Sequence, residues 1–245
     1  MNKQPEVIQA MFSAIAGRYD LLNHLLSANQ DKAWRRRGVA ALNVPPGGRV
    51  LDVGAGTGDL GIELARRHPH VGLICAADFA LPMLHIAQDK FAQVAPTFRR
   101  HFRQDAEATM FACVGADGLR LPHRDDTFDV VMSAFTVRNF CDLTAGLREM
   151  HRVTRRGGQV LVLEFCKPTA RLLRRGFNVF FRHVLPRVGR WISRHPFAYD
   201  YLPHSVEDFV TRREMEELLR AVGYGNVRSK DLTGGVATMF VATKG

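Results

Sequence analysis

Three glycines at alternate positions connect an apolar stretch to a helical pattern, and this loop constrains the fold more than any other feature of the sequence. It lies in DVGAGTGD, residues 52–59, after the apolar run RVLDV and at the start of the amphipathic run DLGIELARR. Glycines let the backbone approach a ligand closely, and open α/β sheets bind ligands where a strand gives way to a helix. We therefore expect a ligand site at the carboxyl end of this strand.

The spacing of the glycines argues against the two common phosphate-binding loops. In the GxGxxG dinucleotide fingerprint, the third glycine counted from Gly54 falls at position 59, where Asp59 would face a pyrophosphate. A P-loop needs GK[ST] after four intervening residues, and this loop has none. The loop instead resembles the [DE]xGxGxG signature of class I S-adenosylmethionine-dependent methyltransferases, whose ligand carries no phosphate.

Apolar runs alternate with helical patterns along the chain, which predicts an α/β fold. The expected strands are residues 49–56, 71–78, 108–117, 127–135, 158–165, 224–230 and 235–243. The expected helices are residues 6–26 with a break near Gly17, 31–42 with Asp31 as N-cap, 59–67, 81–93, a helix capped by Asp142, and 211–222. Near-continuous apolar runs are typical of parallel strands that are covered on both faces. The pattern predicts a Rossmann-like, doubly wound, mostly parallel seven-stranded sheet with helices on both faces.

No internal repeat and no long linker divides the chain, so residues 1–245 are expected to form one domain. Residues 1–43 are expected to add helices in front of the first strand. Residues 95–109 are polar and basic, carry no clear period, and are expected to lie outside the preceding helix.

Acidic residues follow the next two predicted strands. Asp78 ends the second strand, 20 residues beyond Gly58, and Asp117 with Gly118 ends the third. Parallel strands end at the same edge of a sheet, so these residues are expected beside the glycine loop. A carboxylate at Asp78 can accept hydrogen bonds from both ribose hydroxyls, and Asp117 and Gly118 can flank an adenine. The predicted S-adenosylmethionine site therefore comprises Gly54, Gly56, Asp78, Asp117 and Gly118.

Positive charge is concentrated in one segment. The chain carries 34 Lys and Arg against 24 Asp and Glu, a net charge of +10, yet residues 165–199 contain no acid and eight of the basic residues. A uniformly basic nucleic-acid-binding protein would not show this distribution. Residues 169–195 mix Arg with large apolar side chains and predict a basic helical segment. Two interpretations stay open: a helix packed on the sheet, and an interfacial element that contacts anionic lipid.

Several function classes are disfavoured by what the sequence lacks. The four cysteines, Cys75, Cys113, Cys141 and Cys166, are far apart and form no CxxC motif, so we expect neither a metal site nor a disulfide framework. No apolar run reaches the roughly 18–20 residues of a transmembrane helix, and the first residues are unlike a secretory signal. A cytoplasmic protein, peripheral to the inner face of the membrane, is expected.

Nine stretches resemble one family, the ubiquinone/menaquinone biosynthesis C-methyltransferases. They are MFSAIAGRYDLLNHLLS, DKAWRR, VLDVGAGTGDL, LRLPHRDDTFDVV, FTVRNFCD, EMHRV, VLEFCKP, YDYLPHSVEDF and LTGGVA, in this order. The resemblance implies transfer of a methyl group from S-adenosylmethionine to a ring carbon of a prenylated quinol. The ending LTGGVA is similar to the menaquinone branch, whose substrate is a demethylmenaquinol.

Family cofactor contacts carried over by position fall on Thr57, Asp78, Asp117 and Gly118. A serine that often precedes the Phe of the Phe-x-x-Arg-Asn element is replaced here by Ala134. Ser133 comes one residue earlier and is expected on the opposite face of its strand, because neighbouring side chains of a strand alternate between faces.

The methyl sulfonium is already electrophilic, so no metal is expected. The protein must place the sulfonium and the ring carbon in near contact and stabilise the phenolate-like state of the quinol. We expect Arg138 to supply a fixed charge with several donors and Tyr19 to close over the site. Asn139 and His24 are weaker candidates, and no residue is assigned as the general base.

Two other functions stay open at this point. One is methylation of a ubiquinone precursor or of another lipid or phenol by an enzyme of the same fold. The other, of a different class, is RNA binding without catalysis. The oligomeric state and the length of the prenyl chain do not follow from the sequence.

Overall fold

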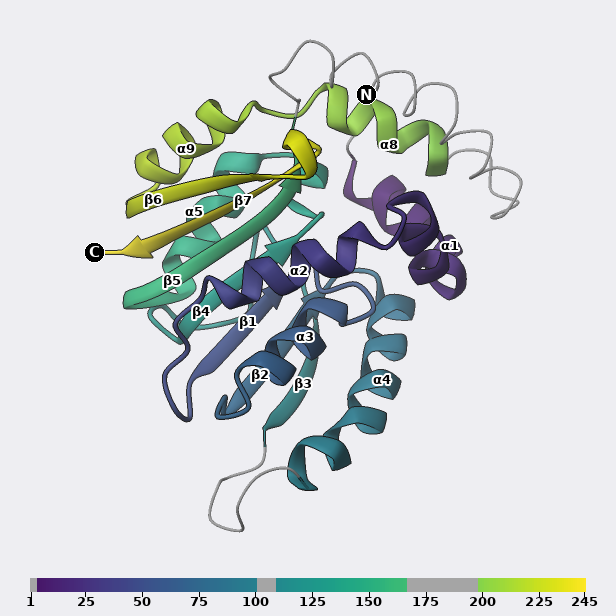
Figure 1. Ribbon diagram of the computed structural model, residues 1–245. Helices are drawn as coiled ribbons and strands as arrows, with labels where there is room; N and C mark the ends of the chain where they lie inside the picture. Colours follow the sequence, from purple (N-terminus) through teal and green to yellow (C-terminus); the bar gives the residue numbers. More distant parts are fainter. Residues whose placement is uncertain (1–3, 101–108, 167–197) are drawn as a thin grey trace.

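The computed structural model describes residues 4–100, 109–166 and 198–245 and contains a seven-stranded sheet with the order β3-β2-β1-β4-β5-β7-β6 (Figure 1). The strands are β1 (Arg49–Val53), β2 (Leu73–Asp78), β3 (Met110–Gly115), β4 (Phe128–Ala134), β5 (Thr154–Phe165), β6 (Tyr224–Leu232) and β7 (Ala237–Lys244). Strands β1 to β5 pair in parallel, whereas β7 is antiparallel to both β5 and β6. This arrangement confirms the predicted doubly wound, mostly parallel sheet.

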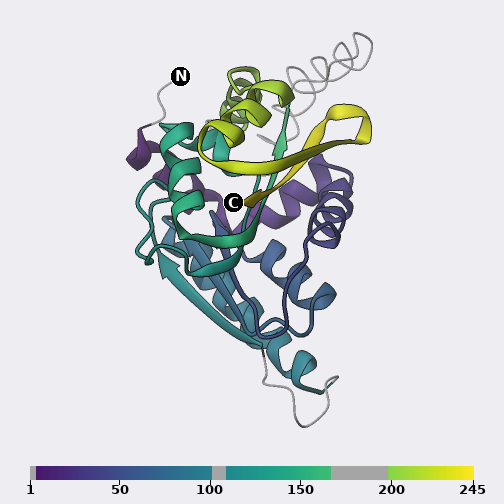
Figure 2. The ribbon, with the colours of Figure 1, turned by 90° about the vertical axis from the view of Figure 1, so that its left-hand side faces the viewer.

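Helices cover both faces of the sheet, as Figure 2 shows from its edge. They are α1 (Pro5–Leu26), α2 (Gln30–Ala40), α3 (Asp59–Arg67), α4 (Leu81–Arg100), α5 (Leu143–Val153), α8 (Ala198–Glu207) and α9 (Arg212–Ala221), with a 3-10 turn, η1, at Val137–Asn139. Strand residues alternate between the two faces. Leu51 packs in the cluster with α5 and α9, whereas its neighbour Val50 packs in the cluster with α2 and α3. The strands are therefore buried on both sides, as their apolar composition predicts.

The first two helices differ from the sequence prediction. Helix α1 runs through Gly17 without a break. A glycine inside a helix costs only about 1 kcal/mol relative to alanine, and the buried face formed by Ile8, Met11 and Ile15 outweighs it. Asp31 is also not an N-cap: Asn29 holds that position, and Asp31 lies buried in the first turn of α2, paired with Arg35 at 2.5 Å.

Helix α4 is longer than predicted. It continues to Arg100 through Pro96, so the first part of the polar stretch 95–109 is helical. The sequence predicts the end of this helix at residue 93, because residues 95–109 are polar and basic and carry no clear period. Residues 101–108 and the predicted basic segment 169–195 lie outside the described residues. In the parts that are described, no helix is both long and apolar enough to cross a membrane.

Other local predictions are confirmed. The side chain of Asp142 accepts a hydrogen bond from the Ala145 N–H at 2.9 Å and caps α5. Leu147, Met150 and Val153 are buried on one face of that helix. Helix α3 has the bounds expected from its period. It begins directly after the glycine loop, which places the loop between β1 and a helix N-terminus.

Candidate active site

The glycine loop turns sharply at the carboxyl end of β1. Gly54, Gly56 and Gly58 all have positive φ angles, between +55° and +83°, a region that other residues rarely adopt. A Cβ atom at Gly54 would lie 2.0 Å from the side chain of Thr136, which follows β4. Glycine at position 54 therefore lets the loop pack against the end of the neighbouring strand.

A cavity of about 70 Å³ lies at this edge of the sheet, between the glycine loop and α1. Six of the eight predicted site residues line it, namely Tyr19, Gly54, Gly56, Asp78, Asp117 and Gly118. The remaining wall is largely apolar and comes from Ile8, Phe12, Phe79, Met83, Leu119, Phe135 and Phe140. Residues from five separate stretches of the chain thus converge on one place.

Asp78 lies at the wall of the cavity and is tied to the glycine loop. Its Oδ2 accepts a hydrogen bond from the Gly56 N–H at 2.8 Å, and its Oδ1 accepts one from the Ala80 N–H at 2.8 Å. Burial raises the pKa of the Asp78 carboxyl, and these backbone donors oppose the rise. Phe79 contributes a third backbone hydrogen bond to this carboxylate. A carboxylate offers about four acceptor positions, so Asp78 can still accept a hydrogen bond from a hydroxyl of a bound ligand.

Tyr19 comes from α1 and faces the glycine loop across the cavity. Its ring lies 3.9 Å from the place where a Cβ of Gly56 would be. Burial raises the pKa of the Tyr19 hydroxyl, and the positive charge of Arg138 opposes the rise. The phenol is therefore protonated at neutral pH, and the side chain of Asn23 is its hydrogen-bond partner in this structure.

Thr57 does not line the cavity, although the family resemblance implies a cofactor contact there. Its hydroxyl donates a hydrogen bond to Asp20 at 2.6 Å and accepts one from Lys90 at 3.1 Å. Lys90 also pairs with Asp20 at 2.6 Å and with Asp59 at 2.7 Å. The Thr57 side chain thus fastens α1 to the loop instead of facing the cavity.

Arg138 is also absent from the cavity wall. It lies in η1, is 5% exposed, and its Nη1 donates to Oε1 of Glu164 at 2.7 Å and to the carbonyl of Phe135. The backbone N–H of Arg138 donates to the other oxygen of Glu164 at 3.3 Å. Glu164 is fully buried. The guanidinium that is expected to supply a charge and donors to the substrate is thus bound to a buried carboxylate and does not line the cavity.

Of the two weaker candidates for the site, one lines the cavity and one does not. His24 pairs with Asp31 at 2.8 Å and lies outside the cavity. Asn139 lines the cavity and accepts a hydrogen bond from Tyr201 of α8 at 3.0 Å. Sequence reasoning missed Tyr201 as a site residue, since 62 positions separate it from its partner. The sequence indicates Tyr201 only through its place in the stretch YDYLPHSVEDF, which resembles the family.

Neither Ser133 nor Ala134 lines the cavity. The Ser133 hydroxyl donates to the carbonyl of Val53 at 2.7 Å, and the residue is 1% exposed. This hydrogen bond joins β4 to β1.

The chemistry of the cavity fits an uncharged nucleoside joined to a cationic group. Among the described residues that line it there is no Lys or Arg, whereas Asp78 and Asp117 contribute carboxylates. A phosphate would have no positive partner here, and a sulfonium would have no like charge beside it. The volume is smaller than the roughly 300 Å³ of common ligand sites, and Ile8, Phe12 and Tyr19 of α1 form part of its wall.

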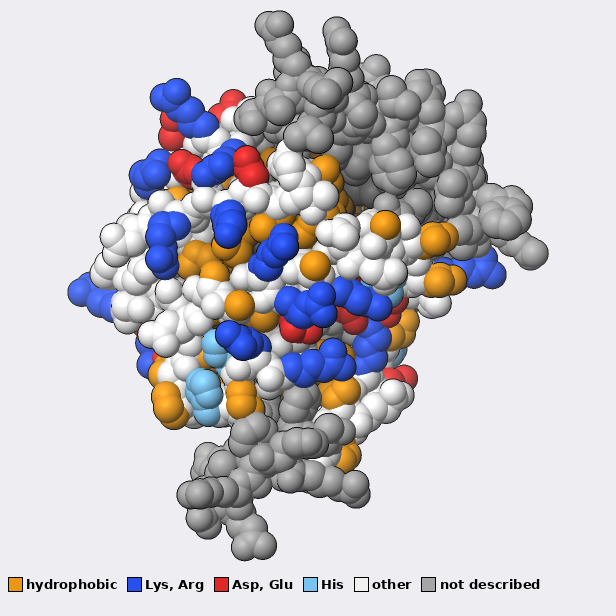
Figure 3. Space-filling view, in the orientation of Figure 1, with side chains coloured by type: hydrophobic (Ala, Val, Ile, Leu, Met, Phe, Trp, Pro, Cys, Tyr) orange, Lys and Arg blue, Asp and Glu red, His pale blue; other side chains and the backbone are white. Residues whose placement is uncertain are grey.

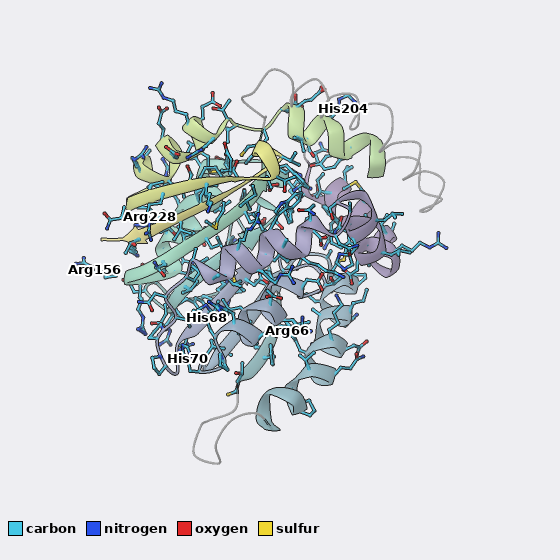
Figure 4. All side chains as sticks on the ribbon, viewed as in Figure 1. Arg66, His68, His70, Arg156, His204 and Arg228 are labelled. Atoms are coloured by element: carbon cyan, nitrogen blue, oxygen red, sulfur yellow. The ribbon has the colours of Figure 1, made fainter. Side chains whose placement is uncertain are left out.

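Lys and Arg side chains gather instead over α2 and α3, interspersed with acids (Figure 3). There a separate groove of about 330 Å³ is lined by Lys32, Arg35, Arg36, Arg66 and Lys90 together with Asp59 and Glu63. Arg156, Arg228, His68 and His70 lie farther off, near the end of the sheet where the parallel strands begin (Figure 4). The Lys and Arg side chains of this groove thus lie away from the cavity lining.

Comparison with known proteins agrees with this geometry. The model of the ubiE/COQ5 methyltransferase family matches residues 1–244. A demethylmenaquinone methyltransferase of Deinococcus radiodurans is 41% identical over 98% of this chain and 93% of its own length. A ubiquinone/menaquinone biosynthesis C-methyltransferase UbiE of Geobacter sulfurreducens is 40% identical over 100% of this chain and 91% of its own length.

Solved structures show the same fold at low sequence identity. A methyltransferase of Thermotoga maritima, described as S-adenosylmethionine-dependent and as a possible histamine N-methyltransferase, superposes with a TM-score of 0.63 at 15% identity. The match covers 96% of this chain and 99% of that one. With a family match over nearly its whole length and the expected fold, this chain belongs to the ubiE/COQ5 methyltransferase family.

Proposed function

We propose that this protein transfers the methyl group of S-adenosylmethionine to a ring carbon of a demethylmenaquinol and so forms menaquinol. The observation that carries the proposal is the cavity in which the glycine loop, the Asp78 carboxylate and the phenol of Tyr19 meet. Relatives named demethylmenaquinone methyltransferase support the substrate, and the LTGGVA ending is similar to that branch.

The cofactor supplies the methyl group as a sulfonium, and five residues of the cavity would hold it. Gly54 and Gly56 bring the backbone close, Asp78 accepts from the ribose hydroxyls, and Asp117 and Gly118 flank the base. Because the cavity is small, side chains of α1 must move outward for the whole cofactor to enter. Thr57 acts indirectly, through its link to α1.

The ring carbon becomes nucleophilic as a quinol oxygen loses its proton. Tyr19 lines the cavity and can donate a hydrogen bond to that oxygen. Arg138 acts from behind the wall: its charge favours a developing phenolate, and its bonds to Glu164 hold the η1 turn in place. Tyr19 is thus proposed as the catalytic contact, and Arg138 as a charged positioning residue.

A second candidate substrate is a ubiquinone precursor, because relatives with 36–40% identity carry names that cover both quinones. In either case the prenyl chain resides in a bilayer. We propose that the basic segment 169–195, which is outside the described residues, brings the protein to the anionic surface of the membrane. The family match favours these enzymatic functions over the RNA-binding alternative.

Quinone profiles of cells that lack the protein test the proposal. We expect demethylmenaquinone to accumulate and menaquinone to be lost, with recovery on return of the wild-type gene. Return of a variant with Asp78→Ala should restore menaquinone poorly. Loss of ubiquinone with normal menaquinone would assign the other branch, and unchanged quinones would contradict both.

A further inference from the structure

A buried tyrosine of α8 reaches the turn after β4 and contacts a side chain of the cavity wall. The Tyr201 hydroxyl donates a hydrogen bond to Oδ1 of Asn139 at 3.0 Å. Tyr201 is 2% exposed and packs in the same cluster as Ile8 and Met83, which also line the cavity. Water therefore competes little for this bond, and the bond joins α8 directly to the site.

The bond determines which end of the Asn139 amide faces the cavity. A carboxamide has an acceptor oxygen and an NH₂ group with two donors. With Oδ1 engaged by Tyr201, the NH₂ group is the end left for a ligand. If the amide turned over, the tyrosine hydroxyl would lose its acceptor, and a buried donor without an acceptor is costly.

The backbone beneath Asn139 is held as firmly as its side chain. The Asn139 N–H donates to the Thr136 carbonyl at 2.8 Å and closes the η1 turn. The preceding residue, Arg138, is bound to the buried Glu164 through both its guanidinium and its backbone N–H. The amide donor is therefore preorganised, which is the condition under which a donor stabilises developing charge most effectively.

We propose that Asn139 donates a hydrogen bond to the reacting oxygen of a phenolic ring substrate and that Tyr201 is the positioning residue that holds the amide in this orientation. This inference rests on the proposed function and deepens it, because it identifies a ring hydroxyl as the group that the site recognises. The donor gains strength as the oxygen becomes negative, so its effect belongs to the transition state.

The test is a double-mutant cycle with a short-chain demethylmenaquinol at saturating cofactor. Asn139→Ala should lower kcat by about 10²-fold, the usual loss for one oxyanion donor. Asn139→Asp, which keeps the shape and the bond from Tyr201 but removes the donor, should lose at least as much. Tyr201→Phe should lower kcat by roughly 2- to 10-fold, the effect of one net hydrogen bond, and should cause no further loss in the Asn139→Ala background.

Tyr224→Phe is the matched control, because Tyr224 is equally buried and its hydroxyl contacts Thr154 at 3.1 Å, away from the cavity lining. It should leave kcat unchanged. Independent losses in the cycle, or wild-type kcat in Asn139→Asp, would overturn the inference, as would an equal loss in the Tyr224 control. Failure of the proposed function gives a different result: the wild type itself binds cofactor but forms no methylated quinol, and the inference falls with it.

Discussion

At the scale of single residues, Asp78 carries the proposed contact with the cofactor ribose. Asp78→Ala removes a charged acceptor, and hydrogen bonds to charged groups contribute about 1.5–3 kcal/mol each. We expect the Kd for S-adenosylmethionine to rise by roughly 10- to 100-fold. Asp78→Asn keeps the shape without the charge and should lose less. Titration calorimetry on folded variants is the measurement, and an unchanged Kd in Asp78→Ala would remove the ribose assignment.

Asp52 gives a prediction about pH. It lies one residue before the end of β1 in a buried position, and burial together with the charges of Asp78 and Asp59 raises its pKa to about 7, against the opposing charge of Arg35. Its Oδ2 has no hydrogen-bond partner among the described residues. The folded state therefore holds this proton more tightly than the unfolded state, whose carboxyl has a pKa near 3.9. Stability that is present below about pH 4 is lost as the pH rises to about 7.

Asp52→Asn removes this titration. We expect its free energy of unfolding to fall less than that of the wild type between pH 4 and pH 7, as measured by urea denaturation. Asp89→Asn, an exposed change on α4, should leave the wild-type slope unaltered. The same slope in Asp52→Asn and wild type would mean that the carboxyl titrates normally.

The sequence predicted single residues well where backbone geometry dictates them. Gly54, Gly56 and Asp78 lie where the strand order requires. The side chains of Thr57 and Arg138 do not face the cavity as expected, because partners in distant elements set their positions. Asp20 accepts a hydrogen bond from the Thr57 hydroxyl, and Glu164 forms an ion pair with the Arg138 guanidinium. A local motif contains no information about such long-range contacts.

At the scale of elements, α1 forms one wall of the cavity and its attachment can be measured. Asp20 on α1 pairs with Lys90 of α4 and accepts from Thr57 of the loop. Asp20→Ala removes a partly exposed ion pair, which contributes up to about 1 kcal/mol. We expect α1 to open more often and S-adenosylmethionine to dissociate roughly 2- to 5-fold faster.

Stopped-flow displacement of the bound cofactor checks this prediction. Glu6→Ala, an exposed change in the first turn of α1, should leave the dissociation rate at the wild-type value. An unaltered rate of cofactor dissociation in Asp20→Ala would show that the pair between Asp20 and Lys90 does not control the opening of α1.

The bounds of the elements show what periodicity can and cannot predict. The order of the strands along the chain and the bounds of the amphipathic helix α3 follow from the apolar pattern, because both faces of the sheet must be apolar. The strand bounds follow less closely: β1 ends at Val53 and not at residue 56, and β5 begins at Thr154 and not at residue 158. The continuous α1 was predicted with a break, since a glycine signals interruption while the packing that overrides it comes from α4 and α8. The contact between Tyr201 and Asn139 likewise joins distant parts of the chain, so it could be found only in the folded structure.

At the scale of the whole molecule, the net charge of +10 comes mainly from the acid-free stretch. Replacing Arg174, Arg175 and Arg182 by Gln should reduce cosedimentation with anionic vesicles, most clearly at low salt, because screening weakens such attraction. The matched control replaces Arg66, Arg156 and Arg228, exposed arginines elsewhere on the surface (Figure 4), by Gln. Equal binding of both triple variants would favour a packed helix over a membrane contact.

The central claim is that the cavity beside the glycine loop transfers a methyl group to a ring carbon. Its most direct test is turnover by the purified protein of a reduced short-chain demethylmenaquinol with S-adenosylmethionine labelled in the methyl group. The account predicts one labelled methyl on the ring carbon, identified by mass spectrometry and NMR, for each cofactor consumed. Label on a quinol oxygen, or no transfer from a protein that binds both molecules, would contradict it.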